Sequence, residues 1–365
     1  MANQYISWDM GTAYDLFISL RVLHNPNRFG LRGSWAAGVR SRLTSTERKA
    51  LEEADLLFWI PLDFLYHLPA PKNTLVVLAE LGRLPPAERL PALGIQPATT
   101  PEQAEVVLGV KERGSWDARD LERLKAVYKS HSRQTRQGMV ETILDCWAHA
   151  AETGERFLAA LQAYQDVFFA EEERRILPAL EHSLDRARRL ARRMNLDELI
   201  EELSQGVRFE PPLFEPDANL VLVPSFWSTP LVIYDRLDPG TWMFVYGGRP
   251  ADASLVPGEM VPDAMLQSLK ALADPTRLRI LRYLYQQPMT PSQLAQKLRL
   301  RAPTVVHHLS ELRLAGLVQL TVETPEKKSE RRYAARLEAV SKLFETIQAF
   351  LSQQDYETIE EIIQS

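Results

Sequence analysis

The chain has 365 residues, of which 45% are hydrophobic and 25% charged, with 24 Pro, 16 Gly and one Cys. This size predicts two or three domains, and the composition excludes wholesale disorder and fibrous structure. The apolar runs are too short to span a membrane and the N-terminus lacks a signal-peptide pattern, so we expect a cytoplasmic protein without a membrane partner. The lone Cys146 can form no intrachain disulfide, which fits a reducing compartment.

The net charge of -5 is distributed unevenly along the chain. Residues 275–336 contain 12 Lys or Arg against 4 Asp or Glu, so this segment carries an excess of eight positive charges and the rest carries -13. A compact cationic segment on an acidic carrier is typical of a nucleic-acid-binding module attached to a region with another role. A solvated basic face would produce the same count.

In chain order, residues 14–114 alternate short amphipathic helical patterns with Pro-rich turns, and residues 116–206 predict several long helices. Ser45 is the expected cap of a helical tract that continues to Leu65. A small antiparallel sheet is predicted near residues 207–246, from strand-like runs at 220–223, 231–234 and 242–246. The Gly- and Pro-rich residues that follow predict a linker at 251–262, between a front region, 1–250, and a second domain, 263–365.

The second domain begins with three short helical patterns. Asp274 and Pro275 begin the first, Thr290 begins the second, and the third runs from Pro303 to Leu314 before Gly316. This is helix-turn-helix spacing. Strand-like residues at 317–322, a polar turn at 324–329 and a return at 331–333 then predict a basic β-hairpin, or wing.

Three motifs in this domain, LKALADPTRLRILRYL, TPSQLAQKL and APTVVHHLSELRLAGLV, resemble the winged helix-turn-helix of the ArsR-type (arsenic-repressor-like) bacterial transcription regulators. The resemblance covers about Met265 to Phe350. A fainter likeness, at Ser19–Pro26 and Val223–Ser225, is to an uncharacterised helical domain found in front of such regulators, and it names no ligand. The expected fold is mainly α, with an N-terminal helical (α+β) domain that includes the small antiparallel sheet and a C-terminal winged helix-turn-helix.

The resemblance implies a DNA-binding regulator, most simply a repressor, that binds an inverted-repeat operator in double-stranded DNA as a homodimer. The third helix of the family enters the major groove, which implies that Thr304, His307 and Ser310 face base edges. His308 is either packed or in contact with DNA. The basic residues that would neutralise phosphates are Arg301, Lys327, Lys328, Arg331 and Arg332. Ala302 stands where the family commonly has Ser, so a helix cap is missing.

The last helical pattern has a wide apolar face, formed by Leu337, Val340, Leu343, Phe344, Ile347, Phe350 and Leu351 and continued by Ile359, Ile362 and Ile363. We expect this face to be the dimer interface, and packing onto its own domain is the alternative.

We expect no metal site and no cofactor. Metal-sensing relatives use cysteines in the second helix or Asp and His in the last helix, and this sequence has neither set. Cys146 and His149 share a helix face, where a packed core pair is favoured over two ligands.

The role of the front region stays open. It holds all seven Trp, most of which we expect in the core, while others line a small apolar effector pocket or a protein-binding groove whose residues are unknown. The basic run from Arg186 to Arg193 is a solvated face or a contact for an anion. No catalytic motif is found, so we expect no enzyme. The alternatives are a DNA-binding adaptor for a protein partner and, less favoured, an enzyme fused to a DNA-binding domain.

Overall fold

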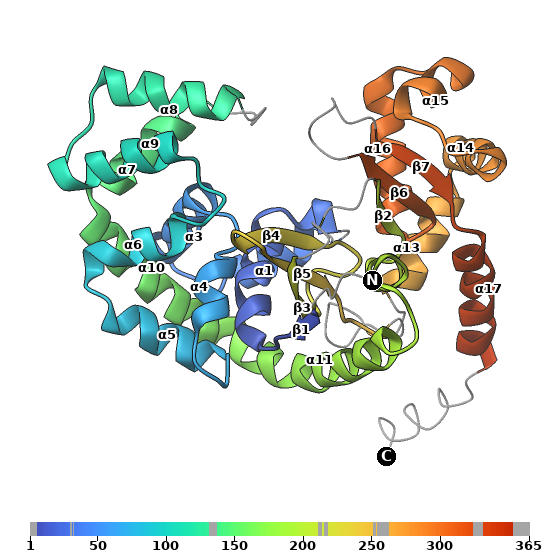
Figure 1. Ribbon diagram of the computed structural model, residues 1–365, viewed down its shortest axis with the longest axis horizontal. Helices are drawn as coiled ribbons and strands as arrows, with labels where there is room; N and C mark the ends of the chain where they lie inside the picture. Colours follow the sequence, from blue (N-terminus) through green and yellow to red (C-terminus); the bar gives the residue numbers. More distant parts are fainter. Residues whose placement is uncertain are drawn as a thin grey trace. The chain divides into compact units, whose positions relative to one another are not determined.

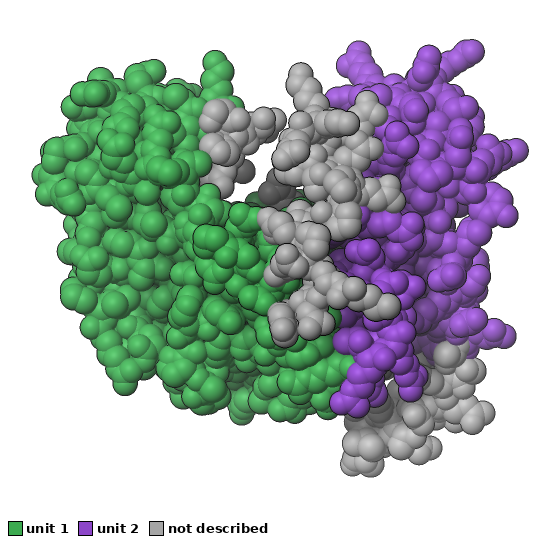
Figure 2. All heavy atoms as spheres, in the orientation of Figure 1, with its two compact units in different colours: residues 1–188, 214–249 green, residues 189–213, 250–365 purple. Residues whose placement is uncertain are grey.

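The structure is a computed structural model that describes residues 6–29, 31, 33–130, 137–210, 214, 218–250, 253, 263–323 and 331–352. The chain forms two compact units, both mostly helical (Figures 1 and 2). Unit 1 comprises Met1–Arg188 and Phe214–Arg249, and unit 2 comprises Arg189–Leu213 and Pro250–Ser365. Within the described ranges, no helix is both long and apolar enough to cross a membrane.

The elements of unit 1 are, in chain order, β1 (Ile6–Trp8), α1 (Thr12–His24), η1 (Pro26–Phe29), α2 (Gly33–Arg40), α3 (Ser45–Leu57), α4 (Leu62–His67), α5 (Thr74–Arg83), α6 (Pro86–Gly94), α7 (Pro101–Arg113), α8 (Ala118–Ser130), α9 (Met139–Ala148), α10 (Ala150–Tyr164), η2 (Gln165–Phe169), α11 (Ala170–Ala191, which ends in unit 2), β3 (Asn219–Ser225), β4 (Ile233–Asp238) and β5 (Thr241–Gly247). The expected cap at Ser45 is corrected by one residue. Thr44 caps α3 in a capping box with Glu47, and the helix ends at Leu57, before Pro61.

The sheet of unit 1 is mixed rather than antiparallel, which corrects the sequence-based expectation. Its strand order is β1-β3-β5-β4, with β1, β3 and β5 parallel and only β4 antiparallel to β5. Six consecutive residues of β3, Leu220–Ser225, are buried. Such a continuous run is typical of a strand covered on both faces in a parallel sheet, whereas a half-exposed antiparallel strand alternates.

Unit 2 contains α12 (Leu196–Leu203), β2 (Val207–Glu210), α13 (Asp263–Leu272), α14 (Pro275–Gln286), α15 (Pro291–Leu298), α16 (Ala302–Leu314), β6 (Val318–Glu323), β7 (Arg332–Ala335) and α17 (Leu337–Ser352). Its sheet has the order β2-β6-β7, with β2 parallel to β6 and β6 antiparallel to β7. The small sheet was expected to span residues 207–246, but β2, at its start, belongs to the wing of unit 2. Residues 251–252 and 254–262 of the expected linker lie outside the described residues.

The core of unit 1 is built around α1, in which every residue from Thr12 to Leu20 is buried. A helix that is apolar on most sides is buried on all of them. Asp15 is a fully buried carboxylate in this core. Asp15 accepts hydrogen bonds from Ser225 Oγ at 2.7 Å, Trp227 N at 2.8 Å and Phe226 N at 3.2 Å, in the turn after β3.

The pKa of Asp15 creates a pH dependence of stability. Burial raises it to about 7, against the lowering effect of the hydrogen bonds from Trp227 and Ser225. Between the unfolded value near 4 and the folded value near 7, the folded chain therefore binds more protons than the unfolded chain. The free energy of unfolding of unit 1 should fall as the pH rises through this window.

We expect Asp15→Asn, which cannot ionise, to reduce that slope between about pH 4 and pH 7. Tryptophan fluorescence during urea unfolding reports on unit 1 alone, because all seven Trp lie in it. Asp185→Asn, at an exposed position, is the control and should keep the wild-type slope. Equal slopes in all three proteins would show that Asp15 does not titrate in the folded chain between these values.

Candidate nucleic-acid interface

Three helices of unit 2 begin and end at local signals. The Asp274 carboxylate accepts a hydrogen bond from Arg277 N at 2.8 Å and so caps α14. Thr290 and Gln293 form a capping box at the start of α15. At the end of α15, Arg299 adopts the left-handed conformation with a φ of 55°, which reverses the chain into α16.

The side of α16 that packs in the core determines which residues are exposed. Val305, Leu309 and Leu312 have no exposed surface and pack against α14 and α15. Thr304, His307 and Ser310 are exposed, as is Arg301 at the N-cap, whose side chain makes no capping hydrogen bond. These four residues are available to a ligand along one helix of 13 residues.

His308 is a packed residue in this structure. Its side chain is mostly buried, and its Nδ1 lies 4.0 Å from Asp274 Oδ1. The backbone N–H of Arg277, and then the charges of Arg277 and His308, hold the pKa of Asp274 below its usual value. This packing fits the structural alternative for His308 better than a base contact.

The wing follows α16 and consists of β6 and β7. Tyr333 of β7 also forms an antiparallel bridge with Met289, just before α15. Arg331 and Arg332, at the start of the returning strand, are exposed. Lys327 and Lys328 lie outside the described residues.

Two exposed residues near α16 were not singled out from the sequence. Val306 is half-exposed, and Arg299 is exposed in the turn before the helix. A branched apolar side chain off the core face could have signalled the first, since such groups contact thymine methyls. The basic turn from Arg299 to Arg301 could have signalled the second.

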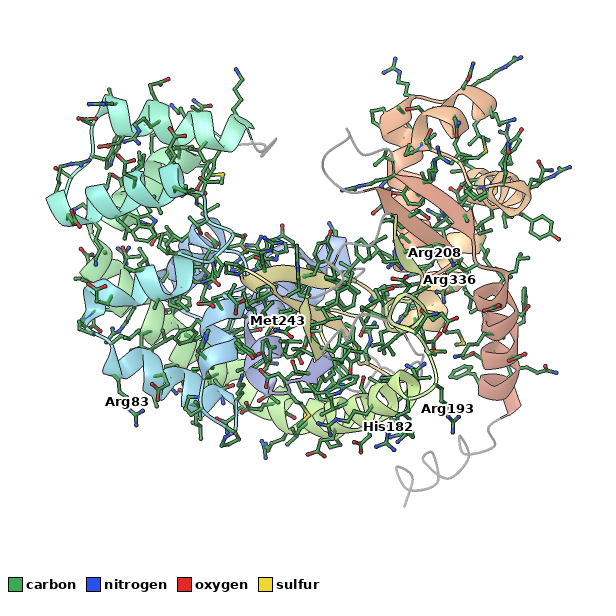
Figure 3. The ribbon with its side chains drawn as sticks, viewed as in Figure 1. Arg83, His182, Arg193, Arg208, Met243 and Arg336 are labelled. Atoms are coloured by element: carbon green, nitrogen blue, oxygen red, sulfur yellow. The ribbon has the colours of Figure 1, made fainter. Side chains whose placement is uncertain are left out.

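Another part of unit 2 is acidic. A polar pocket of about 450 Å³ is lined by Met194, Glu198, Glu201, Glu202, Gly206, Gln319, Ala335, Arg336, Leu337 and Glu338. Figure 3 labels Arg336, its only basic residue. The four glutamates repel phosphate groups, so this pocket is an unfavourable site for DNA. The basic turn before α16 and the wing have the opposite charge.

The apolar face of α17 is divided between the core and the surface. Leu343 is buried in the core of unit 2, so in this structure it is not available to a partner. Leu337, Phe344 and Leu351, spaced by seven residues, are 51%, 60% and 76% exposed. Val340, Ile347 and Phe350 are half-buried, and Ile359, Ile362 and Ile363 lie outside the described residues.

Unit 1 has a small cavity beside a half-exposed tryptophan. The cavity, about 20 Å³, lies among α1, α3 and α10 and is lined by Phe17, Leu20, Arg21, His24, Leu51, Ala54, Asp55, Phe58, Trp59 and Phe157. The Arg21 guanidinium stacks 4.0 Å from the centre of the Trp59 ring and pairs with Asp55 at 2.5 Å. The volume suffices for one water molecule, so a larger ligand would require Trp59 to move.

Cys146 and His149 contact protein groups that account for their positions. Cys146 is buried in the core of α7, α8 and α9, and burial raises the pKa of its thiol to about 12. His149 is the cap residue between α9 and α10, and its Nδ1 is 2.9 Å from the carbonyl oxygen of Asp145. In the part of the chain that is described, no three His, Cys, Asp or Glu side chains are grouped to hold a metal ion.

Comparisons with known proteins agree with the helix-turn-helix geometry. A family model described as a helix-turn-helix domain matches residues 272–321. The uncharacterised HTH-type transcriptional regulator MJ0229 of Methanocaldococcus jannaschii is 35% identical over 83 residues, which are 21% of this chain and 87% of that protein. The chain belongs to the ArsR-type helix-turn-helix transcriptional regulators.

Two further relatives are similar over the same kind of module. The HTH-type transcriptional regulator CmtR of Mycobacterium tuberculosis is 48% identical over 65 residues, 18% of this chain, so the chain spans about half, 55%, of CmtR. The structure of an ArsR-like transcriptional regulator from Rhodococcus sp. RHA1 has 26% identity and a TM-score of 0.22, and the match covers 28% of this chain and 91% of that one. Each comparison leaves most of the chain unmatched.

Proposed function

We propose that this ArsR-type regulator binds an inverted-repeat operator as a homodimer and acts as a repressor, with α16 as the recognition helix. The observation that carries the proposal is the exposed row of Thr304, His307 and Ser310 opposite a fully buried apolar face. A helix presented in this way fits the major groove, where hydroxyl and imidazole groups can bond to base edges. Arg299, Arg301, Arg331 and Arg332, with Lys327 and Lys328, would contact phosphates.

The proposed roles predict two classes of DNA-binding variant. With an operator selected from a random DNA pool, Thr304→Ala or His307→Ala should lower discrimination at one base pair per half-site by about 1–3 kcal/mol. The double variant Lys327→Ala, Arg331→Ala should lower the affinity for all DNA sequences by a similar factor and reduce the salt dependence of binding. Competition binding against single-base operator variants measures both effects.

His308→Ala is the matched control, because the structure packs this side chain against Asp274. It should lower the melting temperature and leave base preference unchanged. If the wing variant relaxes base preference as much as the two α16 variants do, then the wing reads the bases and the proposed role of α16 is wrong.

We propose that α17 forms the dimer interface through the line of Leu337, Phe344 and Leu351. Residues seven apart lie on one side of a helix, and a second copy of α17 would bury them as a heptad seam. Burial of such side chains typically contributes about 1.5–3 kcal/mol each.

Phe344→Glu should therefore convert the protein to a monomer at concentrations where the wild type is a dimer, and operator affinity should fall with it. Sedimentation equilibrium gives the mass. Lys342→Glu introduces the same residue at an exposed position on the other side of α17 and should leave the dimer intact. A Phe344→Glu protein that stays dimeric would place the interface elsewhere.

We further propose that unit 1 senses an effector, and that the DNA-binding domain senses no metal and the protein is not an enzyme. The candidate effector site is the cavity beside Trp59, whose lining combines aromatic rings with the Arg21–Asp55 ion pair and which would have to widen by movement of Trp59 to admit a ligand. The absence of cysteine from the α15 sequence argues against the metal site of metal-sensing relatives. Unit 1 as a docking domain for a protein partner is the other candidate.

Linkage tests the effector role. Native mass spectrometry of the purified full chain would identify a retained small molecule. This molecule should change the affinity of the protein for the operator by about 1–3 kcal/mol. Binding of the operator should change the affinity of the protein for the molecule by the same factor. Trp59→Ala should weaken binding of the molecule, whereas Trp116→Ala, which lies outside the cavity, should leave its binding unchanged. A molecule that leaves operator affinity unchanged, or a retained protein, would favour the docking role.

A further inference from the structure

The sheet of the wing includes a strand from outside the helix-turn-helix. β2 pairs in parallel with β6, with Val207 opposite Leu320 and Phe209 opposite Val322, and Figure 1 shows it beside that strand. It covers the edge of β6 that β7 leaves open. An uncovered edge would expose unpaired backbone groups. The family-model match, residues 272–321, does not include this strand.

A buried arginine joins the same segment to α16. Arg313 is only 8% exposed and donates hydrogen bonds to the carbonyl oxygens of Ser204, at 3.0 Å, and Gln205, at 3.3 Å. These carbonyls lie at the end of α12, where the partial negative charge of a helix terminus attracts a cation. No carboxylate of the described residues lies within ion-pair distance of Arg313. Its guanidinium instead donates to these two carbonyl oxygens. The bond spans 109 residues of sequence.

The turn between α12 and β2 contacts the wing directly. The Gly206 carbonyl oxygen accepts a hydrogen bond from Leu320 N at 3.0 Å, and Gln319 Nε2 donates to Glu201 Oε1 at 2.7 Å. Gly206 has a φ of 93°, and a Cβ there would lie 2.8 Å from Arg336 Cδ. The positive φ favours glycine here, and a Cβ would also displace the Arg336 side chain.

We infer that α12 and β2 are a working part of the DNA-binding unit and that Arg313 is a positioning residue for the recognition helix. Arg313 holds the C-terminal half of α16 to α12, and β2 pairs with β6, the central strand of the wing sheet. The orientation of both DNA-binding elements therefore depends on a segment, residues 196–210, that lies outside the helix-turn-helix match of residues 272–321. This inference rests on the proposed role of α16 as the recognition helix.

Arg313→Gln in the full chain tests the inference with the selected operator duplex. Loss of the charged hydrogen bonds should weaken operator binding by about tenfold or more, with the slope against salt concentration unchanged. Hydrogen exchange at the amides of β2 should become faster. Arg193→Gln removes the same charge from an exposed position in unit 2, labelled in Figure 3, and should change neither quantity.

A variant that leaves Arg313 in place guards against simple misfolding of Arg313→Gln. Gly206→Ala should strain the turn, weaken operator binding in the same direction and leave the salt slope unchanged. In the Arg313→Gln chain, a disulfide between Val207→Cys and Leu320→Cys, which are register partners, should restore operator affinity when oxidised and not when reduced.

The outcomes separate the inference from the proposed function. Wild-type affinity in both Arg313→Gln and Gly206→Ala would overturn the inference, as would a salt slope that falls by about one, because Arg313 would then contact a phosphate itself. Failure of the oxidised disulfide to restore binding would overturn the positioning role. If Thr304→Ala and His307→Ala leave base preference intact, the proposed recognition helix fails, while the exchange data still test the link between Arg313 and β2.

Discussion

The burial of one side of α16 is the constraint on which the arrangement of the DNA-binding unit depends. Val305, Leu309 and Leu312 have no exposed surface, so the rotation of the helix about its axis is fixed by packing. A different rotation would expose these side chains and bury Thr304 or His307 without hydrogen-bond partners, which costs free energy twice. The exposed face of α16 is thus set by the residues that face away from it.

Charge is distributed unevenly over unit 2. The basic residues of the turn before α16 and of the wing contrast with the four glutamates in the pocket beside α12 and α17. A polyanion is attracted to the first set and repelled by the second, with both effects screened over about 8 Å at physiological salt. The proposed DNA contacts of α16 and the wing include none of the residues that line this acidic pocket.

The two units interleave in the sequence. The chain completes the helices of unit 1, contributes α12 and β2 to unit 2, returns to unit 1 for β3, β4 and β5, and only then enters the helix-turn-helix. The buried hydrogen bonds follow the same pattern over long separations, from Asp15 to the turn after β3 and from Arg313 to the end of α12. A single linker between a front domain and a DNA-binding domain therefore does not describe this chain.

The sequence by itself determined the helices of the DNA-binding unit, because their signals are local. The Asp274 and Thr290 caps, and the apolar spacing of Val305, Leu309 and Leu312, act within a few residues, and the structure confirms α14, α15 and α16 close to the expected positions. The resemblance implied that Thr304, His307 and Ser310 face outward, and all three are exposed.

Only the tertiary structure decided which distant segments meet. It placed β2 beside β6, made β3 and β5 parallel, buried Leu343 while leaving Phe344 exposed, and packed His308 against Asp274. A strand pattern states which residues face a core and not which strand lies alongside, and a wide apolar helix face does not state which part its own domain covers. These choices depend on contacts between residues as much as two hundred positions apart, which local propensity does not encode.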